Sequence, residues 1–356
     1  MTPFNFTAIA ANLPSAPALM GNAVVWKPAS TSVLSNWYLY RLYKAAGLPD
    51  GVINFLPGSA RSISAGLLSR PDLAGLHFTG STAVFNSLWK GIADNLSVYR
   101  AYPRLVGETG GKDFILVHPD ADMDAAVTAC VRGAFEYQGQ KCSAASRLYL
   151  PRSIAKPFLD RLAAEIGRLR VGRPEDHSSF VNAVIDEAAF NTIVGCIERA
   201  RANPSCRIMA GGTYDKSEGF FIAPTLVVSE DPRSESMVQE IFGPVLTAYA
   251  YDDADLDSAY GLVDSSSPYA LTGAIFARER SDIVKATTAL RHAAGNFYIN
   301  DKPTGAVVGR QPFGGARGSG TNDKVGSFLN LVRWTSPRTI KENFSPATDW
   351  RYPFLG

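Results

Sequence analysis

The 356-residue chain is 46% hydrophobic and 19% charged, with a formal net charge of +2. This is an ordinary globular composition, long enough for a large core and two domains. The near-neutral charge balance argues against nucleic-acid binding, and no apolar stretch reaches membrane-spanning length.

The first third of the sequence alternates between strand-like and helix-like segments. Short apolar runs are followed by amphipathic ones, and one helix is expected to begin at Ser81 or Thr82. Alternation at this spacing predicts βαβ units and a parallel sheet. Strands are expected at 22–28, 51–58 and 73–80, and helices at 32–49, 63–71 and 81–96.

The alternation continues to about residue 300. A glycine turn lies between two apolar runs in 104–122, and acidic residues near the start of the next segment suit a helix dipole. The segment 304–323 is a glycine-rich loop, and the tail 331–346 is expected to be a strand followed by irregular chain. Further helices are expected at 122–138, 153–169 and 186–202, and strand-like runs at 220–228, 240–251, 269–277 and 294–302.

The cysteines and histidines do not form a disulfide framework or a metal-ligand pattern. No CxxC pair occurs, and the density of four cysteines is low for this length, so a reducing compartment is expected. The histidines are scattered, and no metal site is predicted. The residues concerned are Cys130, Cys142, Cys196, Cys206, His77, His118, His177 and His292.

Cys142 is the candidate nucleophile. It lies in FEYQGQKCSAASRLYL between a lysine and a serine, whereas Cys130 lies among apolar residues. From the pattern alone, a small core side chain and a reactive thiolate are equally good interpretations of Cys142. A cysteine nucleophile also needs a base and donors for an oxyanion. No motif places a histidine there.

Two other residues could complete such a site. Glu108 lies in GETGGK, where the glycines permit a sharp turn, although a surface carboxylate is the more common fate of a glutamate. Asn5 in TPFNFTA could donate its amide to an oxyanion, although most asparagines only cap or turn. FTGS at 78–81 ends a strand and opens a helix, which suits an anion. Lys27 could reach a phosphate or ribose, or could simply be a solvated strand end.

Seven motifs occur together in one order, namely PFNF, WKP, FTGS, ETGGK, GQKC, EIFGPV and PFGG. In this order they resemble the NAD(P)-dependent aldehyde dehydrogenase superfamily, from Pro3 to about Trp334. The stretches GQKCSA, AGNFYIND and KPTGAVVGRQPFGGARGSGTNDK resemble its 1-pyrroline-5-carboxylate dehydrogenase branch, which oxidises L-glutamate γ-semialdehyde to glutamate in proline catabolism. The resemblance implies an α/β fold with a Rossmann-type cofactor domain and an α/β catalytic domain.

The resemblance also implies roles for individual residues. Cys142 matches the nucleophile, Glu108 the base that activates water, and Asn5 with the Cys142 backbone N–H the oxyanion hole. Residues that match NAD contacts are Lys27, Pro28, Ser30, Gly58, Gly80, Ser81, Glu240 and Phe242. Residues that match contacts to the small-molecule substrate are Phe6, Ser143, Gly305, Ala306 and Phe313.

The same resemblance predicts the organisation of the chain. We expect an NAD-binding domain at 1–110, a catalytic domain at 111–328 and an oligomerisation tail at 329–356 that supports a homo-oligomer. Family members have a long segment before PFNF, which begins here at residue 3, so we expect part of the cofactor domain to be missing and its sheet to be incomplete. The resemblance to eukaryotic members implies a location in the mitochondrial matrix.

Ser30 departs from the family pattern, because many relatives have a carboxylate there that holds the ribose hydroxyls. A preference for NAD over NADP is therefore expected from the resemblance to this branch, and Ser30 itself does not indicate it. Alternative interpretations are an aldehyde dehydrogenase of other specificity, a non-catalytic subunit that associates with full-length partners, and a cysteine hydrolase that needs no dinucleotide.

Overall fold

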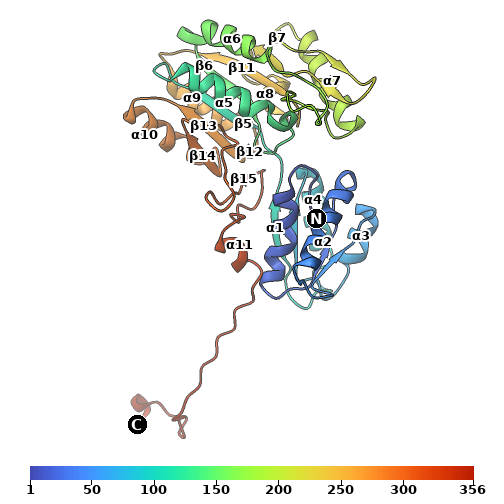
Figure 1. The fold of residues 1–356 in the computed structure, drawn as a ribbon. Helices are drawn as coiled ribbons and strands as arrows, with labels where there is room; N and C mark the ends of the chain where they lie inside the picture. Colours follow the sequence, from blue (N-terminus) through green and yellow to red (C-terminus); the bar gives the residue numbers. More distant parts are fainter.

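The computed structural model describes residues 1–356 as two lobes followed by an extended C-terminal segment (Figure 1). The chain passes from the first lobe to the second between β4 (Arg104–Glu108) and β5 (Asp113–Val117), and the later helix α11 (Phe328–Val332) returns beside α1 (Thr7–Leu19) of the first lobe. None of the helices combines the length and apolarity needed to cross a membrane.

The first lobe holds two separate two-stranded sheets, each parallel. One pairs β1 with β2 and the other pairs β3 with β4, which agrees with the expected βαβ units. Between the strands lie helices that bury small apolar clusters around Trp26 and Phe85. The elements are β1 (Val24–Trp26), η1 (Ser30–Ser32), α2 (Val33–Ala45), β2 (Ile53–Phe55), α3 (Ala60–Leu68), β3 (Gly75–Thr79) and α4 (Thr82–Ala93).

The second lobe is built on a seven-stranded sheet in the order β14-β13-β5-β6-β11-β10-β7. All neighbours are parallel except β10 and β7, which are antiparallel. The strands are β6 (Ala145–Pro151), β7 (Cys206–Ala210), β10 (Thr225–Ser229), β11 (Val245–Tyr251), β13 (Thr272–Phe276) and β14 (Asn296–Ile299).

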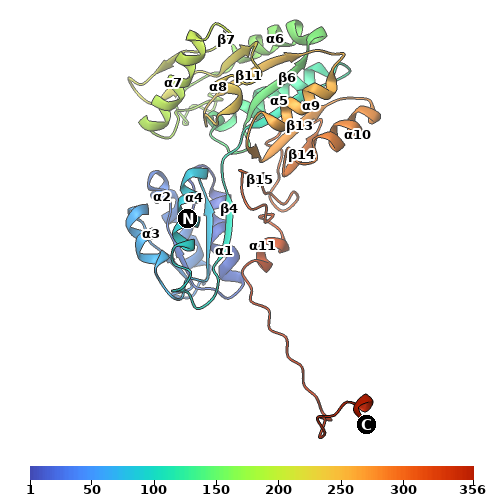
Figure 2. The same ribbon diagram turned by 180° about the vertical axis from the view of Figure 1, so that it is seen from behind.

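Helices cover both faces of this sheet, as parallel sheets require. The larger core cluster packs one face against α5 and α6, and a second cluster packs the other face against α9 and α10 (Figure 2). The helix α7 packs beside β7 at the sheet edge. The bounds are α5 (Met123–Phe135), α6 (Arg152–Ile166), α7 (Glu187–Ala202), α8 (Glu235–Val238), α9 (Leu256–Ser265) and α10 (Arg280–Ala289).

Short elements complete the chain. The pairs β8–β9 and β12–β15 are both antiparallel. Their bounds are β8 (Tyr214–Asp215), β9 (Phe221–Ile222), β12 (Tyr269–Ala270) and β15 (Ala316–Arg317), and the 3₁₀ turns are η2 (Glu136–Gly139) and η3 (Pro353–Leu355).

Most expected elements are confirmed, including the start of α4, where the Ser81 hydroxyl accepts a hydrogen bond from the Val84 N–H at 3.4 Å. The run 220–228 is two strands rather than one, because Pro224 has no N–H to donate to a ladder. The strand expected at the start of the tail is wrong. Residues Phe328–Val332 form α11, whose Leu331 and neighbouring Trp334 pack at helical spacing against the first lobe.

A buried histidine connects three elements of the first lobe. His77 on β3 is 8% exposed, and its Nδ1 lies 2.9 Å from the backbone oxygen of Leu13 on α1. Its ring packs against Trp334, with centroids 4.9 Å apart. Burial, followed by the nearby α-ammonium of Met1, lowers the pKa of His77 to about 3. The neutral imidazole is therefore part of the folded packing.

Replacing His77 with Gln should reduce the loss of stability on acidification. Because the pKa of His77 is about 3 when folded and near 6.5 when unfolded, only the unfolded chain binds this proton as the pH falls below 6.5. The free energy of unfolding should then fall by up to about 1.4 kcal/mol per pH unit. Urea unfolding between about pH 7.5 and 5 measures this slope. The exposed His177→Gln control should retain the wild-type slope, and equal slopes in the two variants would contradict the assignment.

Candidate active site

The loop that carries Cys142 leaves α5 through a strained turn. Tyr137 and Gln138 have φ values of 56° and 58°, which are left-handed and costly for residues other than glycine. The Gln138 side chain compensates by accepting a hydrogen bond from the Asn182 N–H at 3.1 Å. Gly139 continues the left-handed turn against the backbone of Gly243, where a Cβ would not fit. This turn directs the chain back to β6 with Cys142 at the junction between the lobes.

Cys142 is partly exposed, and its thiol is surrounded by acidic groups. Burial raises the pKa of the Cys142 thiol, and the carboxyls of Asp113, Glu108 and Glu240 raise it further, while the Ser143 N–H opposes them. The thiol is therefore protonated at rest. To form the nucleophilic thiolate, a nearby base must remove this proton, or an incoming cation must stabilise the thiolate charge.

Glu108 ends β4 beside this thiol and is 5% exposed. Its Oε2 accepts a hydrogen bond from the Gly315 N–H at 2.9 Å, while Oε1 is buried without a partner. Burial raises the pKa of Glu108, and the Gly315 N–H and the Lys324 ammonium act against it. A carboxyl held by one oxygen and free at the other is suited to proton transfer with a water molecule.

The turn Thr109–Lys112 holds the parts of the site together. The Gly110 N–H donates to the Thr82 hydroxyl at 3.2 Å, and the Gly111 N–H donates to Glu240 Oε1 at 2.8 Å. A Cβ on Gly111 would overlap the backbone oxygen of Cys142. Glycine is required at this close approach because any larger residue would displace the Cys142 loop.

Asn5 reaches the same loop from the start of the chain. Its side chain is 5% exposed, and Nδ2 donates to the backbone oxygen of Gln140, two residues before Cys142, at 3.1 Å. The Gln140 side chain in turn accepts from the Ile185 N–H at 3.0 Å. The predicted oxyanion donor is therefore placed at the Cys142 loop, with its amide engaged by the backbone in this state.

The predicted dinucleotide contacts lie at the carboxyl ends of β1, β2 and β3. Lys27 follows β1, is 8% exposed, and has its pKa lowered by burial. Gly80 and Ser81 lead into α4, whose N-terminal N–H groups attract anions. Gly58, with a φ of 152°, lies in the loop between β2 and α3. A lysine, a glycine turn and a helix N-terminus at the carboxyl ends of these parallel strands fit the phosphates and ribose of a dinucleotide.

The remaining predicted cofactor residues lie in two places, after Lys27 and in the EIFGPV motif. Pro28 and Ser30 continue from Lys27 into η1. Glu240 is held by the Gly111 N–H, and the ring of Phe242 meets that of Phe4 edge-on at 6.0 Å. Phe242 has a φ of 57°, which is uncommon for an aromatic residue. The EIFGPV motif thus borders the Cys142 loop and contacts Phe4, the residue before Asn5.

Two of the predicted substrate residues lie beside the nucleophile loop. The ring of Phe6 stacks on Tyr137 at 5.7 Å, and the Lys141 ammonium lies 5.7 Å from its centroid. Ser143 is buried next to Cys142. Together they give this side of the site an aromatic wall and a hydroxyl.

The glycine-rich loop supplies the others. Gly305 closes a turn onto Lys302, whose ammonium binds Glu136 at 2.7 Å. Ala306 packs against the core that includes α5. Phe313 forms a β-bridge with Val325. Phe313 also lies two residues before Gly315, whose N–H donates to Glu108. The loop is therefore tied both to the nucleophile turn and to the base.

Sequence reasoning missed a buried polar network beneath the turn. Lys112 and Asp113 are 1% exposed, and burial lowers the pKa of Lys112 to about 7 and raises that of Asp113 to about 8. The Thr272 N–H donates to Asp113 Oδ1 at 2.6 Å, and Arg147 Nε donates to the Lys112 backbone oxygen at 2.7 Å. The only sequence signal was two charged residues directly before the apolar run of β5.

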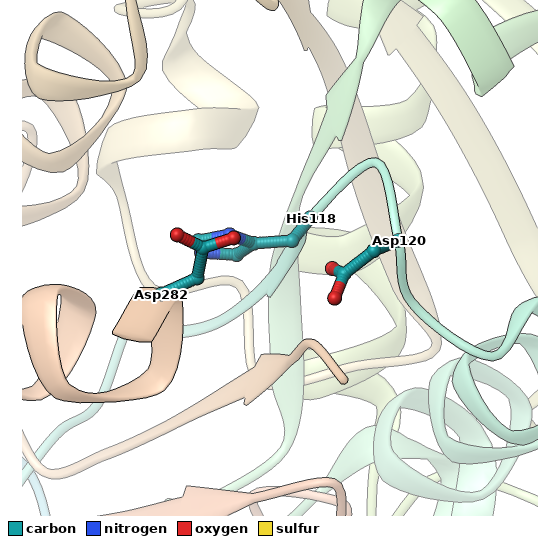
Figure 3. A group of neighbouring side chains, drawn as sticks. All are labelled: His118, Asp120 and Asp282. Atoms are coloured by element: carbon teal, nitrogen blue, oxygen red, sulfur yellow. The ribbon is translucent and has the colours of Figure 1, made fainter. Parts of the chain in front are cut away.

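A second polar cluster lies at the other end of β5. Potential ligand atoms of His118, Asp120 and Asp282 lie within 4.8 Å of one another. Figure 3 shows these three side chains and the segments that carry them. Asp120 accepts hydrogen bonds from the backbone N–H groups of Arg278 and Glu279 at 2.8 and 2.6 Å. These bonds give Asp120 a structural role in holding the segment before α10, and we assign no metal to the cluster.

The comparisons with known proteins identify the family of the chain. The sequence pattern of the aldehyde dehydrogenase family matches residues 1–340. The chain belongs to this family. It is 56% identical to the mitochondrial delta-1-pyrroline-5-carboxylate dehydrogenase of Dictyostelium discoideum, covering 100% of this chain and 64% of that protein. Its identity to the Bos taurus protein of the same name is 51%, with 100% and 63% covered.

A solved structure gives the same result for the fold of this aldehyde dehydrogenase family member. The delta-pyrroline-5-carboxylate dehydrogenase of Mycobacterium tuberculosis bound with NAD superposes with a TM-score of 0.94 at 52% identity, covering 100% of this chain and 65% of that one. The expected family and α/β fold are therefore confirmed. The chain spans less than two thirds of the length of these relatives.

Gly111→Ala should destabilise the junction between the lobes. The added methyl group would overlap the Cys142 backbone oxygen and crowd Asp113 Oδ2, so the free energy of unfolding should fall by about 2 kcal/mol or more. Urea unfolding measures the loss. The matched control is Gly261→Ala on α9, where a Cβ meets nothing within 4 Å, and which should be neutral or slightly stabilising. A Gly111 variant as stable as this control would refute the close approach.

Proposed function

We propose that this chain carries the NAD-dependent oxidation of L-glutamate γ-semialdehyde, the open form of 1-pyrroline-5-carboxylate, to glutamate. The observation that carries the proposal is the meeting of three separate segments at the lobe junction. These segments bring together the thiol of a partly exposed cysteine (Cys142), a buried carboxyl with one free oxygen (Glu108) and a side-chain amide (Asn5). The identity to relatives named for this activity supports the choice of substrate.

The first step is attack of the Cys142 thiolate on the aldehyde carbon. A carbon–sulfur bond forms and the carbonyl electron pair moves to oxygen, which becomes an oxyanion. The Cys142 N–H and the Asn5 amide are the donors for that charge. Because Asn5 Nδ2 donates to the Gln140 backbone oxygen at rest, the amide must turn from that oxygen toward the substrate.

NAD, when bound, would supply the acceptor for the hydride that leaves the substrate carbon. The oxyanion then re-forms the carbonyl, and the acyl group stays on Cys142 as a thioester. Lys27 and the N-terminus of α4 after Gly80 and Ser81 would hold its ribose and phosphates, and Glu240 and Phe242 would border the nicotinamide end. The short distance between Glu240 and the Gly111 N–H, 2.8 Å, ties this border to the turn behind Cys142.

Glu108 completes the reaction by releasing the acyl group. Its free oxygen takes a proton from water, the resulting hydroxide adds to the thioester carbon, and the carbon–sulfur bond breaks to give the carboxylic acid and the thiolate. The raised pKa of Glu108 increases its strength as a base once the carboxyl is ionised. Burial of Glu108 also limits the access of bulk water to the thioester before the base activates a water molecule.

The substrate is a short chain with an aldehyde at one end and an amino acid at the other. Phe6 and Phe313 would border its methylene groups. Ser143 and the backbone of Gly305 and Ala306 would bind the carboxylate, because N–H groups in a glycine turn suit an anion. An aldehyde dehydrogenase of other specificity would be indifferent to changes at Ser143 and Ala306.

We propose the same organisation for the chain as a whole. Residues 1–110 would bind NAD, 111–328 would carry the chemistry, and 329–356 would join copies into a homo-oligomer. The tail exposes large apolar side chains that an interface would cover, namely Ile340, Phe344, Trp350, Tyr352 and Phe354. Relatives named as mitochondrial support a location in the mitochondrial matrix.

Cys142→Ser should abolish NADH formation from pyrroline-5-carboxylate and NAD, because a serine hydroxyl is a far weaker nucleophile here. NADH absorbance measures the reaction. Cys206→Ser is the matched control, since Cys206 is equally semi-buried but lies at the far edge of the sheet, and it should retain full activity. Activity that survives in Cys142→Ser would rule out the thiol mechanism. Inactivity of the wild type, failure of the isolated chain to bind NAD, and its retention by a full-length partner in a pull-down would together favour a non-catalytic subunit.

Glu108→Gln should separate the two halves of the reaction. The first turnover should still release NADH, whereas steady turnover should fall by about 10²–10⁴-fold because thioester hydrolysis loses its base. Rapid-mixing absorbance resolves the initial burst from the steady rate. If the burst falls as much as the steady rate, Glu108 acts before hydride transfer and this assignment fails.

Asn5→Ala should lower kcat by about 10²–10³-fold, the usual cost of one oxyanion donor. The exposed Asn86→Ala on α4 is the matched control and should be neutral. Steady-state kinetics distinguish the role, because a lost oxyanion donor lowers kcat with little change in KM. A change confined to KM would place Asn5 in substrate binding instead.

A further inference from the structure

Lys324 directly follows the glycine-rich loop, and a strained turn sets the direction of its side chain. The φ of Lys324 is 50° and that of Asn322 is 55°, both in the left-handed region that is costly for residues other than glycine. The next residue, Val325, forms a β-bridge with Phe313, whose N–H donates to the Val325 oxygen at 2.9 Å. The turn therefore brings Lys324 beside the PFGG motif, ten residues earlier in the chain.

The Lys324 ammonium binds oxygen atoms of two segments. Nζ donates to the Gly295 oxygen at 2.7 Å and, at 3.4 Å each, to the Gly314 oxygen and Asn296 Oδ1. Asn296 begins β14, and its Oδ1 also accepts from the Gly314 N–H at 3.1 Å. One ammonium group thus ties the turn at Gly314 to the start of β14.

The turn at Gly314 carries the donor that holds the proposed base. The next residue, Gly315, donates its N–H to Glu108 Oε2 at 2.9 Å. A Cβ on Gly295 would overlap the Gly314 oxygen, so the two backbones approach as closely as glycine permits. Displacing the Gly314 oxygen from Lys324 would therefore move the N–H that binds Glu108.

The segment that carries Lys324 also passes directly beside Glu108. A β-bridge joins Glu108 to Gly320, and the Thr321 N–H donates to the Gly107 oxygen at 2.9 Å. The charged and titratable side chains of this surrounding that act on the Glu108 carboxyl, or are acted on by it, are those of Lys324, Asp323 and Cys142. The base is therefore placed between its nucleophile on one side and this segment on the other.

The charges of Asp323 and Lys324 act on Glu108 in opposite directions. Burial raises the pKa of Glu108, the Gly315 N–H and then the Lys324 ammonium lower it, and Asp323 raises it. Asp323 is shared with Arg333, whose Nε lies 2.9 Å from its Oδ1. Lys324 binds only uncharged oxygens, so no ion pair cancels its charge.

We propose that Lys324 is a positioning residue for the base, whose ammonium holds the Gly314–Gly315 turn on Glu108 and favours the ionised carboxylate. This role rests on the proposed function, in which Glu108 activates water for hydrolysis of the thioester. The O–H bond of water breaks, its proton goes to the free Oε1 of Glu108, and the hydroxide adds to the thioester carbon, while Oε2 stays bound to Gly315. Lys324 neither gains nor loses a proton in this step.

Direct titration of Glu108 tests the proposal in the 356-residue chain without any turnover. The side-chain carboxyl carbons of glutamate are labelled with ¹³C and followed by NMR against pH, and the spectrum of Glu108→Gln identifies the Glu108 signal. Lys324→Gln keeps a donor for the Gly295 oxygen but loses the charge, so the pKa of Glu108 should rise by about one unit or more.

Two further variants control for charge and position. Lys324→Arg keeps the charge and should keep the pKa of Glu108 close to that of the wild type. Lys285→Met on α10, which removes an ammonium that pairs with Asp257 at 2.8 Å, should leave the Glu108 titration unchanged. Equal Glu108 titrations in Lys324→Gln and Lys324→Arg would overturn the proposal.

Asp323→Asn provides a change of opposite sign. It removes the charge that raises the pKa of Glu108 and keeps an oxygen for the Thr321 hydroxyl, so the pKa of Glu108 should fall. A role limited to packing would not give shifts of opposite sign at neighbouring residues. This variant decides the matter if Lys324→Gln does not fold, because an unchanged pKa of Glu108 in Asp323→Asn would overturn the proposal.

The pH dependence of NADH formation from pyrroline-5-carboxylate and NAD is the second measurement. Because Glu108 acts as a base only when ionised, a higher pKa in Lys324→Gln should move the acid limb of kcat to higher pH by the same amount. The initial burst should be retained, and a loss that is equal at every pH would overturn the proposal. Absence of turnover in the wild type, together with the expected titrations, would refute the proposed function and leave the action of Lys324 on Glu108 established.

Discussion

The candidate site depends on the close approach of the turn Thr109–Lys112 to the backbone of Cys142. The turn joins the lobes, and its two glycine N–H groups bind a hydroxyl from α4 and the carboxylate of Glu240. Since a side chain on Gly111 would overlap the Cys142 oxygen, the base at the end of β4 and the nucleophile loop share one rigid support. The positions of the thiol and the base relative to each other are therefore set by this turn.

Burial sets the chemistry of this junction. Carboxyl groups at Glu108, Glu240 and Asp113 surround one thiol, and burial raises the pKa of each of the four groups. In a low dielectric the repulsion among their charged forms is strong, and this favours the protonated form of each group. The same environment strengthens the N–H donors available to an oxyanion. Low reactivity at rest and strong stabilisation during reaction thus have one cause.

The sequence predicted what local patterns determine and missed what long-range packing determines. The strands around β1 and β3 and the start of α4 follow from apolar runs and the Ser81 cap, and the motifs supplied the candidate site residues. The helix α1 was missed because Pro14 and Pro17 lie inside it, and α11 was mistaken for a strand because five residues carry little periodicity. The network of Lys112 and Asp113 had no signal, since only the tertiary fold buries them.

The divided sheet of the first lobe bears directly on the proposed activity. Lys27 belongs to one sheet and Gly80 to the other, and a dinucleotide that contacts both would need their separation fixed to within a fraction of an ångström. In the structure the sheets are linked across the gap only near their carboxyl ends, through the backbone of Met1 and Thr2. Hydrogen bonds confined to one end of a ladder leave the other end free to open. The precision of the cofactor edge therefore depends on how firmly the two sheets are held together along the rest of the gap.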